Sequence, residues 1–175
     1  MTDPPRILIA CIGNIFLGDD AFGVEVARRL AGRTLPDGVR VVDFGIRGFD
    51  LALALLDDAD DVPILVDAVP RGEPPGTLYV IEPEWEAGDE AGSARMSPFE
   101  AHAIDPVRVL RLVLALGGHP RRVLLVGCEP TPLDPDDDPP MGLSVPVESA
   151  LDEAVLLVES LIAQVREGRG AGIAR

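Results

Sequence analysis

Five apolar runs of strand length alternate with segments of helical periodicity along this chain of 175 residues. The runs are almost continuously apolar, which is typical of strands covered on both faces of a sheet. The helical segments repeat apolar residues every three or four positions and so would bury one stripe. Strands are expected at 6–12, 39–44, 63–69, 77–81 and 122–128, and helices at 21–31, 49–56, 106–116 and 147–165.

This order predicts an α/β protein, a three-layer α/β/α sandwich around a five-stranded, mostly parallel sheet. The link between the third and fourth strands is short and rich in proline and glycine. The fourth strand is therefore expected to turn back as an antiparallel edge strand. Residues 1–167 are long enough for a single domain with one core, and the glycine-rich end at 168–175 is expected to be a flexible tail.

The charge of the chain excludes several classes of partner. It has 30 acidic and 15 basic residues, a formal net charge of −15, and no lysine. Nucleic acids and anionic membranes bind through clusters of Lys and Arg, so neither is expected as a partner. The first residues lack the charge pattern of a signal peptide, so a cytoplasmic location is expected, and we expect a monomer. Cys11 and Cys128 lie in expected strands without a CxxC partner and are expected to be core thiols.

The segment 12–23 places two carboxylates where an α/β protein often binds a phosphate. It follows the first expected strand and precedes a helix, so it lies at the carboxyl edge of the sheet, where ligands bind. A helix N-terminus at that edge attracts anions, but Asp19 and Asp20 would repel a phosphate. A cation or a cationic group is the better ligand. The structural alternative is that either acid caps the helix or lies in its first turn.

Two further candidate ligands are expected at the same edge of the sheet. Asp67 ends the third expected strand, and a carboxylate after so apolar a run is costly unless it has a partner. His102 lies just before a helix that Asp105 would cap and Pro106 would begin. Two carboxylates and one imidazole in one crevice would suit a divalent ion such as Ni²⁺ or Zn²⁺. The alternatives are a structural carboxylate for Asp67 and an incidental loop residue for His102.

Common catalytic and nucleotide-binding motifs are missing from the sequence. There is no HExxH pair, GxSxG elbow or phosphate-binding Gly-Lys-Ser/Thr, and Gly13, Gly18 and Gly23 are not spaced as GxGxxG. A non-catalytic module that binds a metal or a nucleotide stays open as an alternative. Its support is the glycine turn after the first strand and Asp43 at the end of the second, where a ribose-binding acid would lie.

The segment 13–24 resembles the opening motif of the hydrogenase maturation endopeptidases, which remove the carboxyl-terminal extension from the large-subunit precursor of nickel-iron hydrogenases. Later segments are similar to the family's other motifs in the same order. These are 66–68 around Asp67, His102 with Leu110 beyond it, and 126–130 followed by 141–144. The resemblance runs nearly end to end.

This resemblance implies an endopeptidase of the aspartic type whose metal-contacting residues are Asp20, Asp67 and His102. It also implies that the enzyme recognises nickel already inserted in the precursor, so that nickel is supplied by the substrate and zinc or cadmium would substitute in vitro. The first acid is often Glu in the family, and Asp20 is shorter by one methylene. Whether the three residues only recognise the metal or also take part in hydrolysis stays open, and the nucleophile is unassigned.

Four residues are expected to shape the loops beside the substrate: Gly13, Asn14, Asp43 and Arg47. Asp43 matches the first position of a turn that is commonly of the Asp-Gly-Gly-Thr type in the family, whereas the residues after it depart from that pattern. Arg47 is a candidate contact to the substrate, with a structural ion pair as the alternative.

Overall fold

The computed structural model describes residues 4–57, 60–83, 106–119, 122–134, 138 and 140–168. Its elements follow one another in the predicted order, with a short 3-10 helix, η1, between the first strand and the first helix. They are β1 (Ile7–Ile12), η1 (Gly18–Ala21), α1 (Phe22–Leu30), β2 (Val39–Gly45), α2 (Gly48–Leu56), β3 (Val62–Ala68), β4 (Leu78–Ile81), α3 (Pro106–Ala115), β5 (Leu124–Cys128) and α4 (Val145–Arg166).

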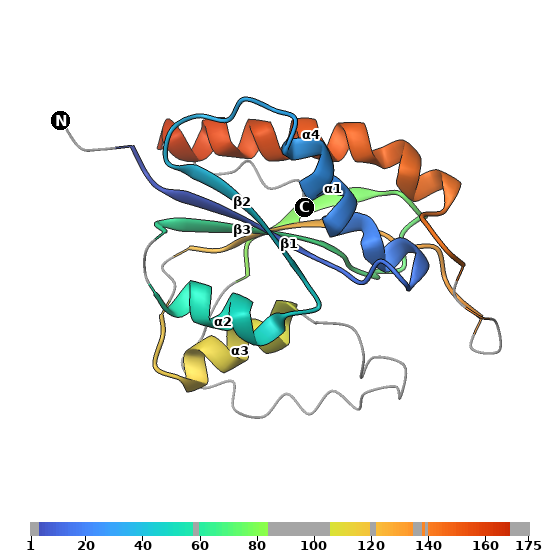
Figure 1. Ribbon diagram of the computed structural model, residues 1–175, viewed down its shortest axis with the longest axis horizontal. Coiled ribbons are helices and arrows are strands. Elements are labelled where there is room, and N and C mark those ends of the chain that lie inside the picture. Colours follow the sequence, from blue (N-terminus) through green and yellow to red (C-terminus); the bar gives the residue numbers. More distant parts are fainter. Residues whose placement is uncertain are drawn as a thin grey trace.

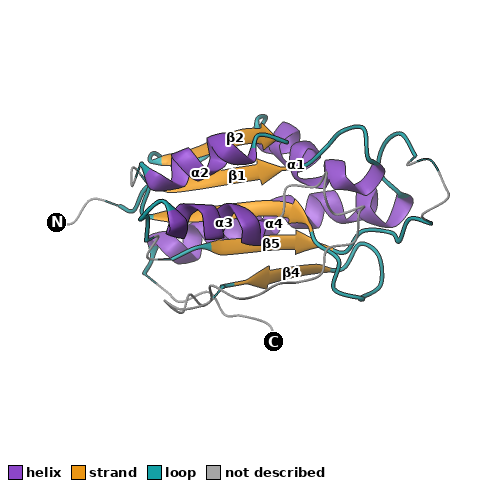
Figure 2. Cartoon of the chain, turned by 90° about the horizontal axis from the view of Figure 1, so that it is seen from below, coloured by secondary structure: helices purple, strands orange, loops and turns teal. Residues whose placement is uncertain are grey.

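The sheet has five strands in the order β2-β1-β3-β5-β4 (Figure 2). β1 pairs in parallel with β2 and β3, and β3 pairs in parallel with β5. Only β4 runs antiparallel, at the edge next to β5, as predicted from its short proline-rich link. Helices α1 and α4 cover one face of the sheet and α2 and α3 cover the other (Figure 1), which confirms the three-layer α/β/α sandwich.

The core has one part on each face of the sheet, because successive strand residues point to opposite faces. In β1, Ile7, Ile9 and Cys11 pack in the layer under α1 and α4. Leu8 and Ile12 pack in the layer under α2 and α3. β2 is the other edge strand and has only one neighbouring strand, so most of its residues are only half-buried despite their apolar sequence.

The last helix begins two residues earlier than its apolar stripe predicts. α4 starts at Val145 because Ser144 takes an extended backbone at the N-cap and Pro146 suits the first helical turn. Cys11 and Cys128 are both buried and free, which confirms their prediction as core thiols. Within the described residues, the structure has no helix that is both long and apolar enough to cross a membrane.

Candidate functional site

The turn after β1 folds back so that Asp20 lies beside the end of the strand. The backbone N–H of Asn14 donates to the Asp20 carbonyl at 3.1 Å and to Asp20 Oδ2 at 3.0 Å. Asn14 Oδ1 in turn accepts from Phe16 N at 3.0 Å. Gly13 has φ +154°, and a Cβ there would lie 3.2 Å from the Asp20 carbonyl carbon and closer still to its oxygen. Glycine is therefore required at this position for the turn to close.

Asp20 is a partly buried carboxyl group in η1. Burial raises the pKa of Asp20 above its ordinary value, and the hydrogen bond from Asn14 N, which lowers it, offsets only part of that effect. Burial removes part of the hydration of the Asp20 carboxylate, so a nearby cation would stabilise this charged form. η1 contacts β3, the strand that carries Asp67.

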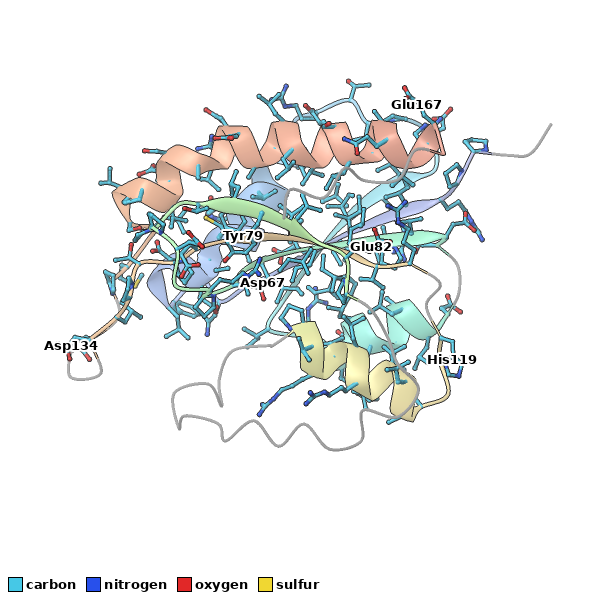
Figure 3. The ribbon with its side chains drawn as sticks, turned by 180° about the vertical axis from the view of Figure 1, so that it is seen from behind. Asp67, Tyr79, Glu82, His119, Asp134 and Glu167 are labelled. Carbon is cyan, nitrogen blue, oxygen red and sulfur yellow. The ribbon has the colours of Figure 1, made fainter. Side chains whose placement is uncertain are left out.

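Asp67 lies at the carboxyl end of β3, where its main chain is in register with Gly127 of β5. Its side chain is only 3% exposed, and Oδ1 accepts a hydrogen bond from Ala68 N at 2.8 Å. Figure 3 shows Asp67 and Tyr79 toward one end of the sheet, and Glu82 and His119 toward the other. The structure thus brings the elements of Asp20 and Asp67 together at the predicted edge. His119 lies toward the opposite edge.

His102, the third predicted metal ligand, lies outside the described residues, and so does Asp105. Pro106 begins α3, as predicted. Among the residues that the structure describes, no three side chains of His, Cys, Asp or Glu are grouped to hold a metal ion. The described part of the candidate site is therefore the pair Asp20 and Asp67.

Asp19 does not cap a helix, and the N-cap alternative is wrong for both acids. The N-cap positions of η1 and α1 are Leu17 and Ala21, and neither makes a side-chain capping bond. Both acids do lie in the first turn of η1. Asp19 Oδ2 instead accepts from Thr131 N and Ser144 Oγ, both at 2.8 Å, and Oδ1 accepts from Ser144 N at 2.6 Å. Through these hydrogen bonds, Asp19 holds the segment between β5 and α4 against the turn that contains Asp20.

Replacing Asp19 with asparagine is expected to weaken the attachment of this segment to the turn and to lower the stability of the protein. An amide offers one accepting oxygen in place of two, so at least one partly buried N–H or O–H loses its partner, at a cost of about 1–3 kcal/mol. Urea unfolding should show this loss of stability, and limited proteolysis should cut the segment 131–144 faster. Asp57→Asn, at an exposed position that ends α2, is the matched control. Equal stability of the Asp19→Asn variant and the wild type would contradict the assignment.

Glu129 is a second buried acid whose structural role the sequence did not reveal. It is 4% exposed and accepts hydrogen bonds from Arg71 N at 2.7 Å, Gly72 N at 3.0 Å and Tyr79 Oη at 3.1 Å. Tyr79 Oη also donates to the Val69 carbonyl. Burial by itself raises the pKa of Glu129, but the hydrogen bonds from Arg71, Gly72 and Tyr79 outweigh burial and hold the pKa below its ordinary value. Glu129 thereby fixes the turn that directly follows the Asp67 strand.

The lowered pKa of Glu129 predicts a pH-dependent contribution to stability. The Glu129 carboxylate binds a proton more weakly in the folded protein than in the unfolded chain. Ionised Glu129 therefore contributes fully to the free energy of unfolding above its ordinary pKa, and this contribution is lost as the pH falls through the lower pKa of the folded state. Glu129→Gln is expected to destabilise the protein at pH 7 by about 1.5–3 kcal/mol. The difference from wild type should shrink in urea titrations repeated toward acid pH. Glu153→Gln, on the exposed face of α4, should show neither effect.

Asp43 and Arg47 build the loop that follows β2. Asp43 Oδ1 accepts from Gly45 N at 2.8 Å and closes a turn, and Gly45 has φ +53°. Arg47 Nη2 donates to the Asp43 carbonyl at 2.5 Å, and its Nη1 lies 3.5 Å from Asp50 Oδ2. The structural ion pair considered for Arg47 is therefore present. A contact of Arg47 with the substrate stays a prediction.

Residues 24–161 match the model of a protein family described as hydrogenase maturation protease. The chain belongs to this family. The hydrogenase expression/formation protein HupM of Azotobacter chroococcum is 36% identical to this hydrogenase maturation protease over 161 residues, which are 91% of this chain and 73% of HupM. A putative hydrogenase maturation protease of Methanocaldococcus jannaschii is 33% identical over 152 residues, 87% of this chain and 93% of the relative.

Solved structures of hydrogenase maturation proteases share the fold of this member. The hydrogenase maturating endopeptidase HybD from Escherichia coli superposes with a TM-score of 0.70 at 29% sequence identity, over 91% of this chain and 93% of HybD. These matches confirm the resemblance seen in the sequence motifs. The protein is a hydrogenase maturation endopeptidase rather than a non-catalytic metal- or nucleotide-binding module. By its family role it acts on hydrogenase subunit precursors.

Proposed function

We propose that this maturation protease removes the carboxyl-terminal extension of a nickel-iron hydrogenase large-subunit precursor after nickel has been inserted. Asp20, Asp67 and His102 would contact the nickel that the precursor carries. The observation that supports this best is the pair of poorly solvated carboxylates at the carboxyl edge of the sheet. Asp67 is 3% exposed, and burial raises the pKa of Asp20.

A divalent ion suits this pair for an electrostatic reason. Asp67 is buried and Asp20 partly buried, and the elements that carry them are in contact, so a divalent cation bound by both carboxylates would stabilise their charged forms. The hydrogen bonds from Asn14 N to Asp20 and from Ala68 N to Asp67 orient the two groups before any metal arrives. Carboxylate oxygens together with one imidazole nitrogen are suitable donors for Ni²⁺, and zinc or cadmium should bind the same residues in vitro.

Contact with the metal would let the enzyme distinguish a precursor that carries nickel from one that does not. A precursor without nickel would offer Asp20, Asp67 and His102 no metal to contact, so it would bind poorly, whereas the loaded precursor would bind through that metal. We expect one chain to act alone in the cytoplasm. Its partner is a protein rather than nucleic acid or membrane, because a net charge of −15 disfavours polyanions.

The proposal is tested with purified protease and two preparations of the same precursor, one loaded with nickel and one free of nickel. Intact-mass spectrometry should show that only the loaded precursor becomes shorter, by loss of a segment from its carboxyl terminus. Equal cleavage of both preparations would contradict nickel recognition. No shortening of the loaded precursor would contradict the endopeptidase proposal for this client.

A further inference from the structure

Exposed apolar side chains gather in three segments of loops and helix starts that are joined to the candidate site. Of the eleven large apolar residues that are exposed in the described part of the chain, six lie in the segments 15–16, 46–49 and 141–145. Their exposed fractions range from 42% for Ile15 to 80% for Met141. We call these six side chains the apolar rim: Ile15, Phe16, Ile46, Phe49, Met141 and Val145.

Contacts between the loops bring the rim into one region. Gly13 N donates to the Gly45 carbonyl at 3.1 Å, which joins the turn after β1 to the turn after β2. Asp19 accepts from Ser144 N at 2.6 Å, which joins the first turn to the start of α4. Every rim residue lies within four positions of one of these joined residues. The three segments that carry the rim are therefore joined at the turn that carries Asp20. Exposed apolar patches bordered by polar groups mark sites of protein interaction.

The charge around the rim indicates the character of its partner. The described residues of the segments 13–20, 43–50, 129–134, 138 and 140–145 include seven acidic residues and a single basic one, Arg47. Arg47 is already engaged by the Asp43 carbonyl and by Asp50. Apolar contacts surrounded by negative charge favour an occupant that is apolar and carries positive charge beside its apolar residues.

We propose that the apolar rim binds the segment of the precursor that flanks the cleaved bond, and that this segment is apolar with Lys or Arg beside it. This inference rests on the proposed function, because it takes the precursor as substrate. Continuity with the site supports this occupant. The turn that carries the rim residues Ile15 and Phe16 also carries Asp20, so a polypeptide whose nickel reaches Asp20 would pass beside Ile15 and Phe16.

The test combines two substitutions in the rim, Phe16→Ser and Ile46→Ser, in one variant. Leu156→Ser is the matched control, because Leu156 is 58% exposed on α4, away from the rim. With nickel-loaded precursor, the rim variant should show KM raised by about tenfold and kcat within about twofold of wild type. Its affinity for zinc, measured by calorimetry, should be unchanged. For the wild type, KM should rise between about 50 mM and about 300 mM sodium chloride as screening weakens the attraction.

Several results would overturn the inference while leaving the proposed function intact. One is an unchanged KM in the rim variant, and another is a wild-type KM that does not change with salt. A third is a loss of zinc affinity in the rim variant, which would place the substituted side chains at the metal. A wild-type dimer that the rim substitutions convert to monomers would assign the rim to a second copy of this chain. If the wild type fails to cleave the loaded precursor, calorimetric binding of that precursor to both proteins still decides the inference. Equal affinities would then overturn it.

Discussion

Gly23→Ala is expected to destabilise the protein by at least about 3 kcal/mol, a large share of the stability of an ordinary domain. A Cβ at Gly23 would lie 2.8 Å from Ile12 N and closer still to the carbonyl oxygens of Ile12 and Val66. These atoms belong to the backbones of β1 and β3, which pair with each other in the middle of the sheet. They have little freedom to move, so α1 would have to lift away from the sheet.

Urea unfolding followed by circular dichroism measures this effect directly. Gly32→Ala is the matched control, because a Cβ at Gly32 would have its nearest neighbour, Arg29 O, at an ordinary 3.6 Å. That variant should lie within about 0.5 kcal/mol of wild type. Similar midpoints for Gly23→Ala and Gly32→Ala would show that α1 is not held against the sheet as the structure has it.

Asp20→Asn is expected to abolish processing of the nickel-loaded precursor, with a loss of at least about 100-fold in kcat/KM. The substitution keeps the shape of the side chain and an oxygen for the hydrogen bond from Asn14 N, but it removes the charge that would face the metal. Asp67→Asn should have a similar effect on processing. Zinc affinity should fall in parallel in both variants.

The same substitution at Asp20 should leave the metal-free protein folded and more stable at pH 7. Burial raises the pKa of Asp20, so the folded state disfavours the charged carboxylate, and stability declines as pH rises from the ordinary value of 3.8 through the folded pKa. Asparagine removes that penalty, and the advantage over wild type should vanish below about pH 3.8. Asp37→Asn, at an exposed position before β2, is the control for both measurements. A folded Asp20→Asn variant with full activity would refute a role of Asp20 at the metal.

Sequence patterns were enough to predict the elements and their layers. The continuous apolar run at Ile7–Ile12 required a strand covered on both faces, and β1 is buried along its whole length. The short proline-rich link before Leu78 required an antiparallel edge strand, since a parallel return needs a longer crossover. Helix ends were less accurate, and α4 begins before its apolar stripe because Ser144 and Pro146 act through local backbone geometry.

The functions of individual acids were harder to predict. Asp19 and Asp20 are adjacent and chemically identical, yet Asp19 is bound by Thr131 and Ser144, whereas Asp20 accepts from Asn14 N and has its pKa raised by burial. Glu129 gave no sign in the sequence that it would hold the turn at Arg71 and Gly72. The main-chain N–H groups that donate to Asp19 and Glu129 from distant segments lie more than 50 positions away, whereas periodicity and spacing describe only local relations.

The amino-acid sequence by itself determined the α/β order, the family and the edge of the sheet at which Asp20 and Asp67 lie, because strand and helix periods and motif spacing are properties of neighbouring residues. Which carboxylates accept hydrogen bonds from distant segments, and which lose hydration through burial, was decided by the tertiary structure alone. Hydrogen bonding and burial depend on which distant segments meet, and that is set by the packing of α1 on the sheet through Gly23 and by the loops that converge on Asp19.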